Sequence, residues 1–280
     1  MRNTVTENLI NDYDTHLCKE ERASGTREKY RRDITSFALF LKDEPLTKSA
    51  VIAWRDMLVA KAYAPVTINS MIAALNGFFD FIGRRDCRLK FLKIQRRLFR
   101  EKSRDLSRAE YDALIETAYR LGRERTALLM ETICACGIRV SEVKYITVSA
   151  AKEQRVDISL KGKIRTILIP QKLCRKLLKY ARKQKVTAGE IFLTRSGKGM
   201  SRGQIWAEMK LICKAAGVED TKVFPHNLRH LFASVFYKAC KDIVKLADIL
   251  GHSSIETTRI YLIATSHEHE RQLEKLRLVI

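Results

Sequence analysis

The feature that most constrains how this chain folds is a strongly basic segment between residues 84 and 104. The segment contains ten cations and two acids. The cations are Arg84, Arg85, Arg88, Lys90, Lys93, Arg96, Arg97, Arg100, Lys102 and Arg104, and the acids are Asp86 and Glu101. A run with this charge density is typical of a solvated face, a flexible linker or a strap along a phosphate backbone. We interpret residues 84–104 as a basic linker between two domains, at 1–83 and 105–280, and the high charge of the whole chain favours a strap that lies along a phosphate backbone.

Residues 1–83 are expected to form a small all-helical domain. After Thr26, which is placed to cap a helix, apolar side chains recur at helical spacing at Tyr30, Ile34, Phe37 and Leu41. Another helix is predicted to begin at Thr47, and a further one follows Pro65 and stops at Gly83. The apolar stripes of these segments predict a helical bundle.

Residues 105–280 combine helices with one β-hairpin. The chain is helical up to Gly137, which is placed to end a helix. Two β-rich runs follow at 155–160 and 164–169, and the Lys161-Gly162-Lys163 stretch between them predicts a hairpin with lysines at its tip. The chain then returns to helices. The predicted fold class is therefore mainly α with a small β-sheet.

The charge of the whole chain indicates the kind of partner. The 53 Lys and Arg residues against 32 Asp and Glu give a formal net charge of +21 and a pI of about 9.8. This charge balance favours a polyanionic binding partner. Nucleic acid is the first candidate and an acidic membrane surface is the second. The seven cysteines are scattered without a C-x-x-C pair, which favours reduced thiols in a cytoplasmic protein. No stretch approaches the roughly 18 uncharged residues of a membrane span, so we expect a soluble protein with no membrane partner.

Three short motifs bring together the side chains that can do chemistry. In Gly137-Ile138-Arg139-Val140-Ser141-Glu142, an arginine follows a helix end, and the glutamate three residues later is placed to orient it. In Phe224-Pro225-His226-Asn227-Leu228-Arg229-His230, the proline suits a first helical turn. The histidine and arginine that follow it then share a face near the positive helix end, where a phosphate binds well. The third motif runs from Leu250-Gly251-His252 to Tyr261.

Other patterns argue against a metal or a nucleotide cofactor. His226 and His230 have the spacing of a zinc pair, but the metalloprotease pattern needs Glu where Asn227 stands, and no third ligand is apparent. The glycine-rich stretch 197–203 matches neither the dinucleotide fingerprint nor the Walker loop. We therefore expect no cofactor and no metal, and we interpret His230 as a residue that packs or supports the site.

The order of these motifs resembles that of the tyrosine recombinase family. Along the chain, the order is G-x-R-x-x-E, the lysine-tipped hairpin, H-x-L-R, L-G-H and a tyrosine nine residues after the histidine of L-G-H. These are the integrase and Xer-like site-specific DNA recombinases. The resemblance covers nearly the whole chain and implies a SAM-like core-binding domain at 1–83 and a catalytic domain at 105–280. It implies the following site residues: Arg139, His226, Arg229 and His252 around the phosphate, Tyr261 as the nucleophile, and Lys161 on the hairpin, with Lys163 as the alternative.

The resemblance also implies the chemistry. A tyrosine hydroxyl attacks a DNA phosphodiester, which gives a 3′-phosphotyrosyl enzyme and a free 5′-hydroxyl without ATP. Planar, permanently charged arginines suit a clamp on the non-bridging oxygens. Tyrosine has an ordinary pKa near 10 and needs a base, for which His226 is the candidate, while the leaving oxygen needs an acid, for which the hairpin lysine is the candidate. His252 is expected to donate a hydrogen bond to the phosphoryl oxygens.

The family further implies paired recombination sites in double-stranded DNA, a homo-tetramer, a Holliday junction and room for an accessory directionality factor. Residues 265–280 are expected to form a tail with a helix over 270–280, which docks on a neighbouring protomer or packs on its own domain. The expected biological role is integration or excision of a mobile element. The alternatives are an Xer-like dimer-resolving recombinase, a type IB topoisomerase and a non-catalytic DNA-binding regulator.

Overall fold

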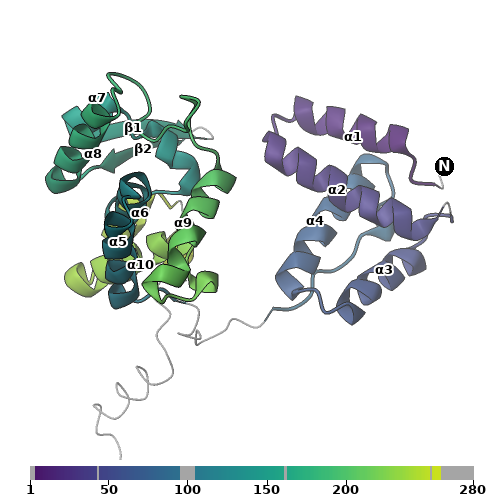
Figure 1. Ribbon diagram of the computed structural model, residues 1–280. Helices are drawn as coiled ribbons and strands as arrows, with labels where there is room; N and C mark the ends of the chain where they lie inside the picture. Colours follow the sequence, from purple (N-terminus) through teal and green to yellow (C-terminus); the bar gives the residue numbers. More distant parts are fainter. Residues whose placement is uncertain (1–3, 43, 95–104, 161–162, 253, 260–280) are drawn as a thin grey trace, which may run out of the picture. The chain divides into compact units, whose positions relative to one another are not determined.

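The structure, a computed structural model, describes residues 4–42, 44–94, 105–160, 163–252 and 254–259 (Figure 1). The chain divides into two compact units, Met1–Arg96 and Arg97–Ile280, which we call the N-terminal and the C-terminal unit. Each unit is built around a hydrophobic core of its own. The described chain is mostly helical with one small sheet, which confirms the predicted fold class.

The described part of the N-terminal unit is a bundle of four α-helices followed by a short 3₁₀ helix. These are α1 (Glu7–Lys19), α2 (Ser24–Leu41), α3 (Lys48–Ala60), α4 (Pro65–Phe81) and η1 (Arg85–Cys87). The largest fully buried side chains are aromatic: Phe37 from α2, Trp54 from α3, and Phe78 and Phe79 from α4. Thr47 caps α3 through its side chain, and Pro65 is the first residue of α4, as expected.

The second helix begins earlier than predicted. α2 begins at Ser24, its N-cap residue is Ala23, and no side chain caps it. The backbone N–H of Thr26 already donates to the carbonyl of Ala23 at 2.8 Å, so Thr26 lies inside the first turn. The prediction that Thr26 caps this helix was therefore wrong. The apolar stripe was predicted correctly, since Ile34, Phe37 and Leu41 are buried.

The first part of the basic segment packs onto the N-terminal unit. Cys87 and Leu89 are buried in its core, while the basic residues beside them point outward. Asn76 of α4 accepts from the backbone N–H of Leu89 and donates to its carbonyl, both at 2.9 Å. Asn69, two turns earlier on α4, makes the same pair of bonds with Leu92. The expected linker therefore has a fixed first half, and residues 95–104 lie outside the described residues.

The C-terminal unit surrounds one central helix. In sequence order its described elements are α5 (Arg108–Arg120), α6 (Glu124–Cys136), η3 (Val140–Tyr145), α7 (Val148–Glu153), β1 (Arg155–Leu160), β2 (Lys163–Leu168), α8 (Gln171–Lys183), α9 (Arg202–Ala216), η4 (Asp220–Lys222), α10 (Pro225–Cys240), α11 (Ile243–Leu250) and α12 (Ile255–Arg259). Helix α6 packs against α5, α8, α9 and α10 (Figure 1). This packing fixes the end of α6, where the first sequence motif begins.

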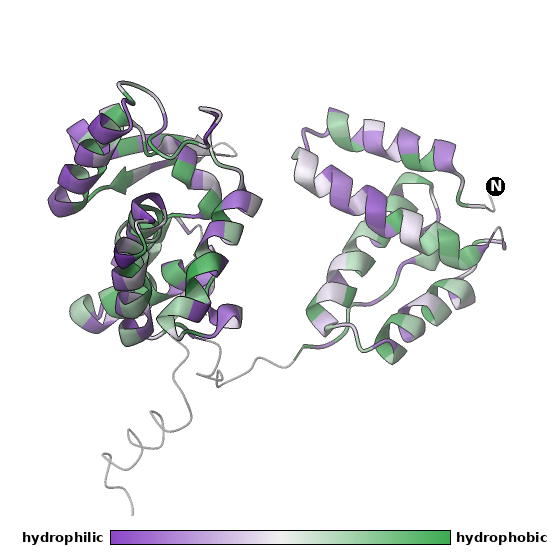
Figure 2. Ribbon diagram, in the orientation of Figure 1, coloured by the Kyte–Doolittle hydropathy of each residue, from purple (hydrophilic) through white to green (hydrophobic). Residues whose placement is uncertain are grey.

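The outer helices of this unit are amphipathic. In α8, Leu173 and Leu177 are buried, whereas Lys172, Arg175 and Lys179 are exposed. Figure 2 shows the mixture of hydrophilic and hydrophobic residues along this helix. The apolar stripe packs on α6 and α7 and leaves the cations in water.

Strands β1 and β2 form the predicted antiparallel hairpin. Leu160 pairs with Lys163 and Arg155 with Leu168, so two residues join the strands. The second strand begins at Lys163, one residue earlier than predicted, because a two-residue connection is enough for this hairpin. The tip residues Lys161 and Gly162 lie outside the described residues.

Several chemical features of the described chain bear on function. All seven cysteines are free thiols. No group of three or more metal-binding side chains gathers at one place among the described residues. In the same residues, no helix has both the length and the apolar composition needed to cross a bilayer.

Candidate active site

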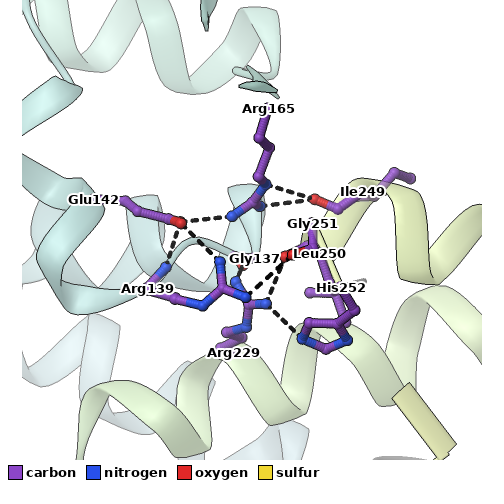
Figure 3. Close-up of polar contacts among 9 residues, drawn as sticks. All are labelled: Gly137, Arg139, Glu142, Arg165, Arg229, Ile249, Leu250, Gly251 and His252. Atoms are coloured by element: carbon purple, nitrogen blue, oxygen red, sulfur yellow. Dashed lines mark hydrogen bonds and ion pairs between the residues drawn. The ribbon is translucent and has the colours of Figure 1, made fainter. Parts of the chain in front are cut away.

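Four side chains meet near the end of α11 (Figure 3). Each of them can bind a phosphate or hold a neighbouring side chain that does. Arg139 follows α6, Arg165 lies on β2, Arg229 lies on α10 and His252 follows α11. We call the three arginines the arginine cluster. Arg139 and Gly251, which are in contact here, are 112 residues apart in the sequence. The site is therefore assembled by the packing of the C-terminal unit.

Three consecutive carbonyls at the end of α11 hold the arginine cluster. The carbonyl of Ile249 accepts from Arg165 Nη2 at 2.7 Å, that of Leu250 accepts from Arg229 Nη2 at 2.7 Å, and that of Gly251 accepts from Arg139 Nη2 at 3.3 Å. Carbonyls at a helix C-terminus lack partners within the helix and carry partial negative charge. They therefore offset the repulsion among the three guanidinium groups.

The turn after α6 positions Arg139. Helix α6 ends at Cys136, and Gly137 adopts a left-handed backbone conformation with φ of 59°. A Cβ on Gly137 would overlap the ring of Phe232, so this turn requires glycine. The carboxylate of Glu142 accepts from the backbone N–H of Arg139 at 2.8 Å and from its Nη1 at 2.9 Å. The side chain of Arg139 is still 41% exposed.

Glu142 is fully buried and shared by two arginines. Its Oε2 also accepts from Arg165 Nη1 at 2.6 Å. Burial alone would raise the pKa of Glu142, but the backbone N–H of Arg139 and the charge of Arg165 hold this pKa below its ordinary value. The carboxylate is therefore ionised at neutral pH. Burial lowers the pKa of Arg165, although a guanidinium stays charged in proteins.

Arg229 connects the turn after α6 with the end of α11. Its side chain is buried, and Nη1 donates to the carbonyl of Gly137 at 2.6 Å. Its Nη2 donates to Leu250 and also lies 2.9 Å from Nε2 of His252. The guanidinium is thus fixed from three directions before any substrate is bound.

His252 is neutral and acts as an acceptor in this arrangement. A guanidinium can only donate, so Nε2 of His252 accepts from Arg229. The ring proton then lies on Nδ1, which donates to Oγ1 of Thr258 at 2.8 Å. Burial first, and then the charges of Arg229 and Arg139, lower the pKa of His252 to about 4. This geometry differs from the donor role expected for His252, because Nε2 already faces a donor.

His226 lies in the first turn of α10, which begins at Pro225 as expected. Its side chain is exposed, whereas Arg229, one turn later, is buried. His226 lies close enough to His252 to lower the pKa of that ring. His230, on the same helix, is buried and belongs to the interior of the unit.

Comparison with known proteins decides the family. The Phage integrase family matches residues 104–268, and the N-terminal SAM-like domain of phage integrases matches residues 10–86. The chain belongs to the phage integrase family. Tyrosine recombinase XerA of Pyrococcus furiosus is 28% identical over 287 residues, which cover 99% of this chain and 96% of that protein. Tyrosine recombinase XerC of Roseiflexus castenholzii is 30% identical over 274 residues, which cover 88% of this chain and 85% of that protein.

The fold of this recombinase is also that of a solved integrase. A lambda integrase tetramer bound to a Holliday junction superposes with a TM-score of 0.73 at 19% identity, over 93% of this chain and 78% of that chain. The family and its full-length relatives make the protein an enzyme, a site-specific tyrosine recombinase. The prediction of this family from the sequence is confirmed.

The structure brings together three of the residues expected at the recombinase site. Arg139, Arg229 and His252 contact the same helix end or each other, and His226 lies nearby. Lys161 and Tyr261 lie outside the described residues. Lys163, the alternative to Lys161, is the first residue of β2. The catalytic roles of these residues stay predictions.

Sequence reasoning missed Arg165 and Thr258. The signal for Arg165 in the sequence was incomplete: its spacing puts it on the same side of β2 as Ile167, but only the structure shows that this side is the buried one. A charged side chain on the buried side of a strand needs a partner inside the protein. Thr258 gave no such signal, because its contact with His252 depends on how α12 follows α11.

Proposed function

We propose that this recombinase cleaves and rejoins DNA strands at defined sites, with Tyr261 as the nucleophile. The observation that carries the proposal is the arginine cluster at the end of α11. Arg229 is held by two carbonyls and by His252, and Arg139 is held by Glu142 and by the carbonyl of Gly251. Preorganised guanidinium groups stabilise the charge that builds on the non-bridging oxygens during attack on phosphorus.

The proposed reaction conserves the energy of the phosphodiester bond. The hydroxyl oxygen of Tyr261 forms a bond to phosphorus, and the bond from phosphorus to the 5′ oxygen breaks. His226 takes the phenolic proton, and the hairpin lysine, Lys161 or Lys163, gives a proton to the departing 5′ oxygen. A 5′-hydroxyl from a second strand then attacks the phosphotyrosine and releases Tyr261. The cationic side chains supply the electrostatic stabilisation, so the proposed reaction needs no metal ion and no ATP.

In this proposal His252 acts first by fixing Arg229. Its Nε2 accepts from the guanidinium, and its Nδ1 is held by Thr258. A donor role toward the phosphate requires the ring proton to move to Nε2 as Arg229 turns toward the substrate. The neutral ring, with a pKa of about 4, adds no positive charge to a cluster that already has three guanidinium groups.

We further propose that the enzyme acts as a tetramer on paired sites in double-stranded DNA. Lambda integrase, whose fold this chain shares, has been solved as a dimer on a core site and as a tetramer on a Holliday junction. The net charge of +21 supports a DNA partner. We place the enzyme in the cytoplasm and assign it to integration or excision of a mobile element. We also propose that an accessory factor sets the direction of recombination. Residues 265–280 are proposed to dock on the same protomer or on a neighbouring one.

A covalent-capture experiment tests the nucleophile. The protein is incubated with EDTA and with nicked duplexes drawn from the DNA that flanks its gene, then denatured, and any DNA-linked peptide is sequenced. We expect an adduct on Tyr261 that is absent from Tyr261→Phe. Tyr63→Phe is the matched control, because Tyr63 is exposed on the N-terminal unit and should form the adduct normally.

The result also separates the alternatives. An adduct on another residue, or cleavage retained by Tyr261→Phe, would contradict the assignment. Tight binding without an adduct on any duplex would favour the DNA-binding regulator. Relaxation of supercoils without exchange between two captured sites would favour a type IB topoisomerase. The captured sites themselves distinguish mobile-element ends from the sites of an Xer-like dimer-resolving enzyme.

A further inference from the structure

Glu142 pairs with two arginines that differ in their access to solvent. Its Oε1 accepts from Arg139 Nη1 at 2.9 Å, and its Oε2 accepts from Arg165 Nη1 at 2.6 Å. The side chain of Arg139 is 41% exposed, whereas that of Arg165 is 9% exposed and that of Glu142 is fully buried. One of the two arginines can therefore reach DNA, and the other cannot.

Arg165 is held inside the protein on both sides of its guanidinium. Its Nε and Nη2 donate to the carbonyl of Ile249 at 3.2 and 2.7 Å, while Nη1 faces Glu142 (Figure 3). Gly251, with φ of 61°, lies against the aliphatic part of the side chain, where a Cβ would overlap Cδ of Arg165. The backbone of β2 and the end of α11 thus fix the side chain away from solvent.

A carboxylate that faces the phosphate clamp creates an electrostatic problem. If Glu142 paired with Arg139 alone, the pair would carry no net charge and would attract a phosphodiester weakly. Glu142 is nevertheless needed, because it caps η3 and orients the guanidinium of Arg139. Adding Arg165 on the opposite oxygen leaves the trio with one net positive charge, and that charge faces solvent at Arg139.

We infer that Arg165 is a positioning residue that neutralises Glu142, so that Arg139 both stays oriented and keeps its positive charge for the scissile phosphate. This inference rests on the proposed function, in which Arg139 clamps that phosphate. Arg165 acts through Glu142 and does not contact DNA. The hairpin strand thereby contributes a charge to the clamp as well as carrying the candidate lysine near its tip.

A double-mutant cycle tests the inference. Single-turnover formation of the covalent adduct is measured on a captured duplex with saturating protein, for wild type, Arg165→Met, Glu142→Gln and the double variant. We expect Arg165→Met to be slower on the order of 10²-fold, similar to the loss of one charge-stabilising donor. The double variant should be at least about tenfold faster than Arg165→Met, because the carboxylate that opposes Arg139 is gone. Arg182→Met, an exposed arginine on α8, should match wild type.

Two further measurements separate charge from shape. Arg165→Lys keeps the positive charge beside Glu142 but not the planar guanidinium that also reaches Ile249, so it should lose less activity than Arg165→Met. Thermal unfolding of every variant sets an assay temperature at which all of them are folded. A duplex with a neutral methylphosphonate at the scissile position needs less positive charge, so the penalty of Arg165→Met should shrink on it by at least about tenfold.

The outcomes are distinct from those of the proposed function. If wild type forms no adduct, the proposed function fails. If wild type forms the adduct and Arg165→Met is as fast, the inference is overturned. It is also overturned if the double variant is as slow as Arg165→Met, if Arg165→Lys loses as much as Arg165→Met, or if the penalty is the same on the neutral linkage. Any of these would leave Arg165 with a packing role alone.

Discussion

Acidification from pH 7 to pH 5 is expected to destabilise the C-terminal unit through His252. Burial and the neighbouring Arg229, Arg139, Arg165 and His226 lower the pKa of this ring from 6.5 to about 4. The unfolded chain therefore binds the proton first as the pH falls. The stability contributed by the neutral ring is fully present above pH 6.5 and is lost as the pH falls toward and through 4.

The magnitude follows from the two pKa values. At 1.36 kcal/mol per pH unit, the full difference is about 3 kcal/mol, of which about 2 kcal/mol is lost between pH 7 and pH 5. Water reaches part of the ring and screens the interaction, so we expect a loss of about 1 kcal/mol over this range. The Arg229 guanidinium and the protonated ring would then repel each other.

The direct assay is an NMR titration of His252 in the full-length protein labelled with ¹⁵N and ¹³C. We expect a midpoint near 4 and, at neutral pH, a proton on Nδ1. Urea unfolding of wild type and of His252→Gln at pH 7 and pH 5 gives the free energy of unfolding of each protein. The loss between the two pH values should be larger in wild type than in His252→Gln. Thr258→Val serves as a control, because it removes the acceptor for Nδ1 but leaves Arg229 in place, so the proton should stay on Nδ1 and the midpoint should stay well below 6.5. A midpoint near 6.5 would refute the reasoning, since it would mean that the ring is neither buried nor faced by the guanidinium groups.

Three more results are expected. Gly251→Ala should lower the free energy of unfolding by about 2 kcal/mol, because alanine is strained at φ of 61°. The same substitution should slow cleavage, because the new Cβ would displace Arg165. A melting temperature equal to that of wild type would contradict this prediction. Lys90→Gln with Lys93→Gln should reduce the slope of log affinity against log salt by up to about 0.9 for each DNA phosphate that the variant no longer neutralises, and an equal slope would remove these lysines from the DNA interface. Deleting residues 270–280 should impair assembly on paired DNA sites more than binding to one site, which native gels measure; normal synapsis by the truncated protein would count against the tail.

Local patterns predicted the helices because the forces that form a helix act between near neighbours. Thr47 and Pro65 were placed correctly, since a side-chain cap and a fixed φ act within one turn. Thr26 was misplaced because α2 begins at Ser24 without a side-chain cap, so a capping side chain does not mark its start. The basic segment is not a uniform linker, because Cys87 and Leu89 within it fill the core of the N-terminal unit.

The candidate site was predicted in part. Residue types and their order indicated Arg139, Arg229 and His252, and the structure brings these three together. The partners that hold them were hidden, because backbone carbonyls such as that of Leu250 have no sequence signature. Arg165 is recognisable only once the hairpin register shows which side of β2 is buried.

The sequence by itself determined the helices, the hairpin, the basic surface and the ordered motifs that name the family, because spacing and charge are properties of neighbouring residues. Only the tertiary structure decided that one helix end holds three arginines, that Glu142 is shared between two of them, and that His252 accepts from Arg229. Apart from the local pair of Arg139 and Glu142, these contacts join residues between 21 and 112 positions apart. They form because the packing of α6 against α10, and of α10 against α11, places guanidinium groups next to carbonyls that no local pattern reveals.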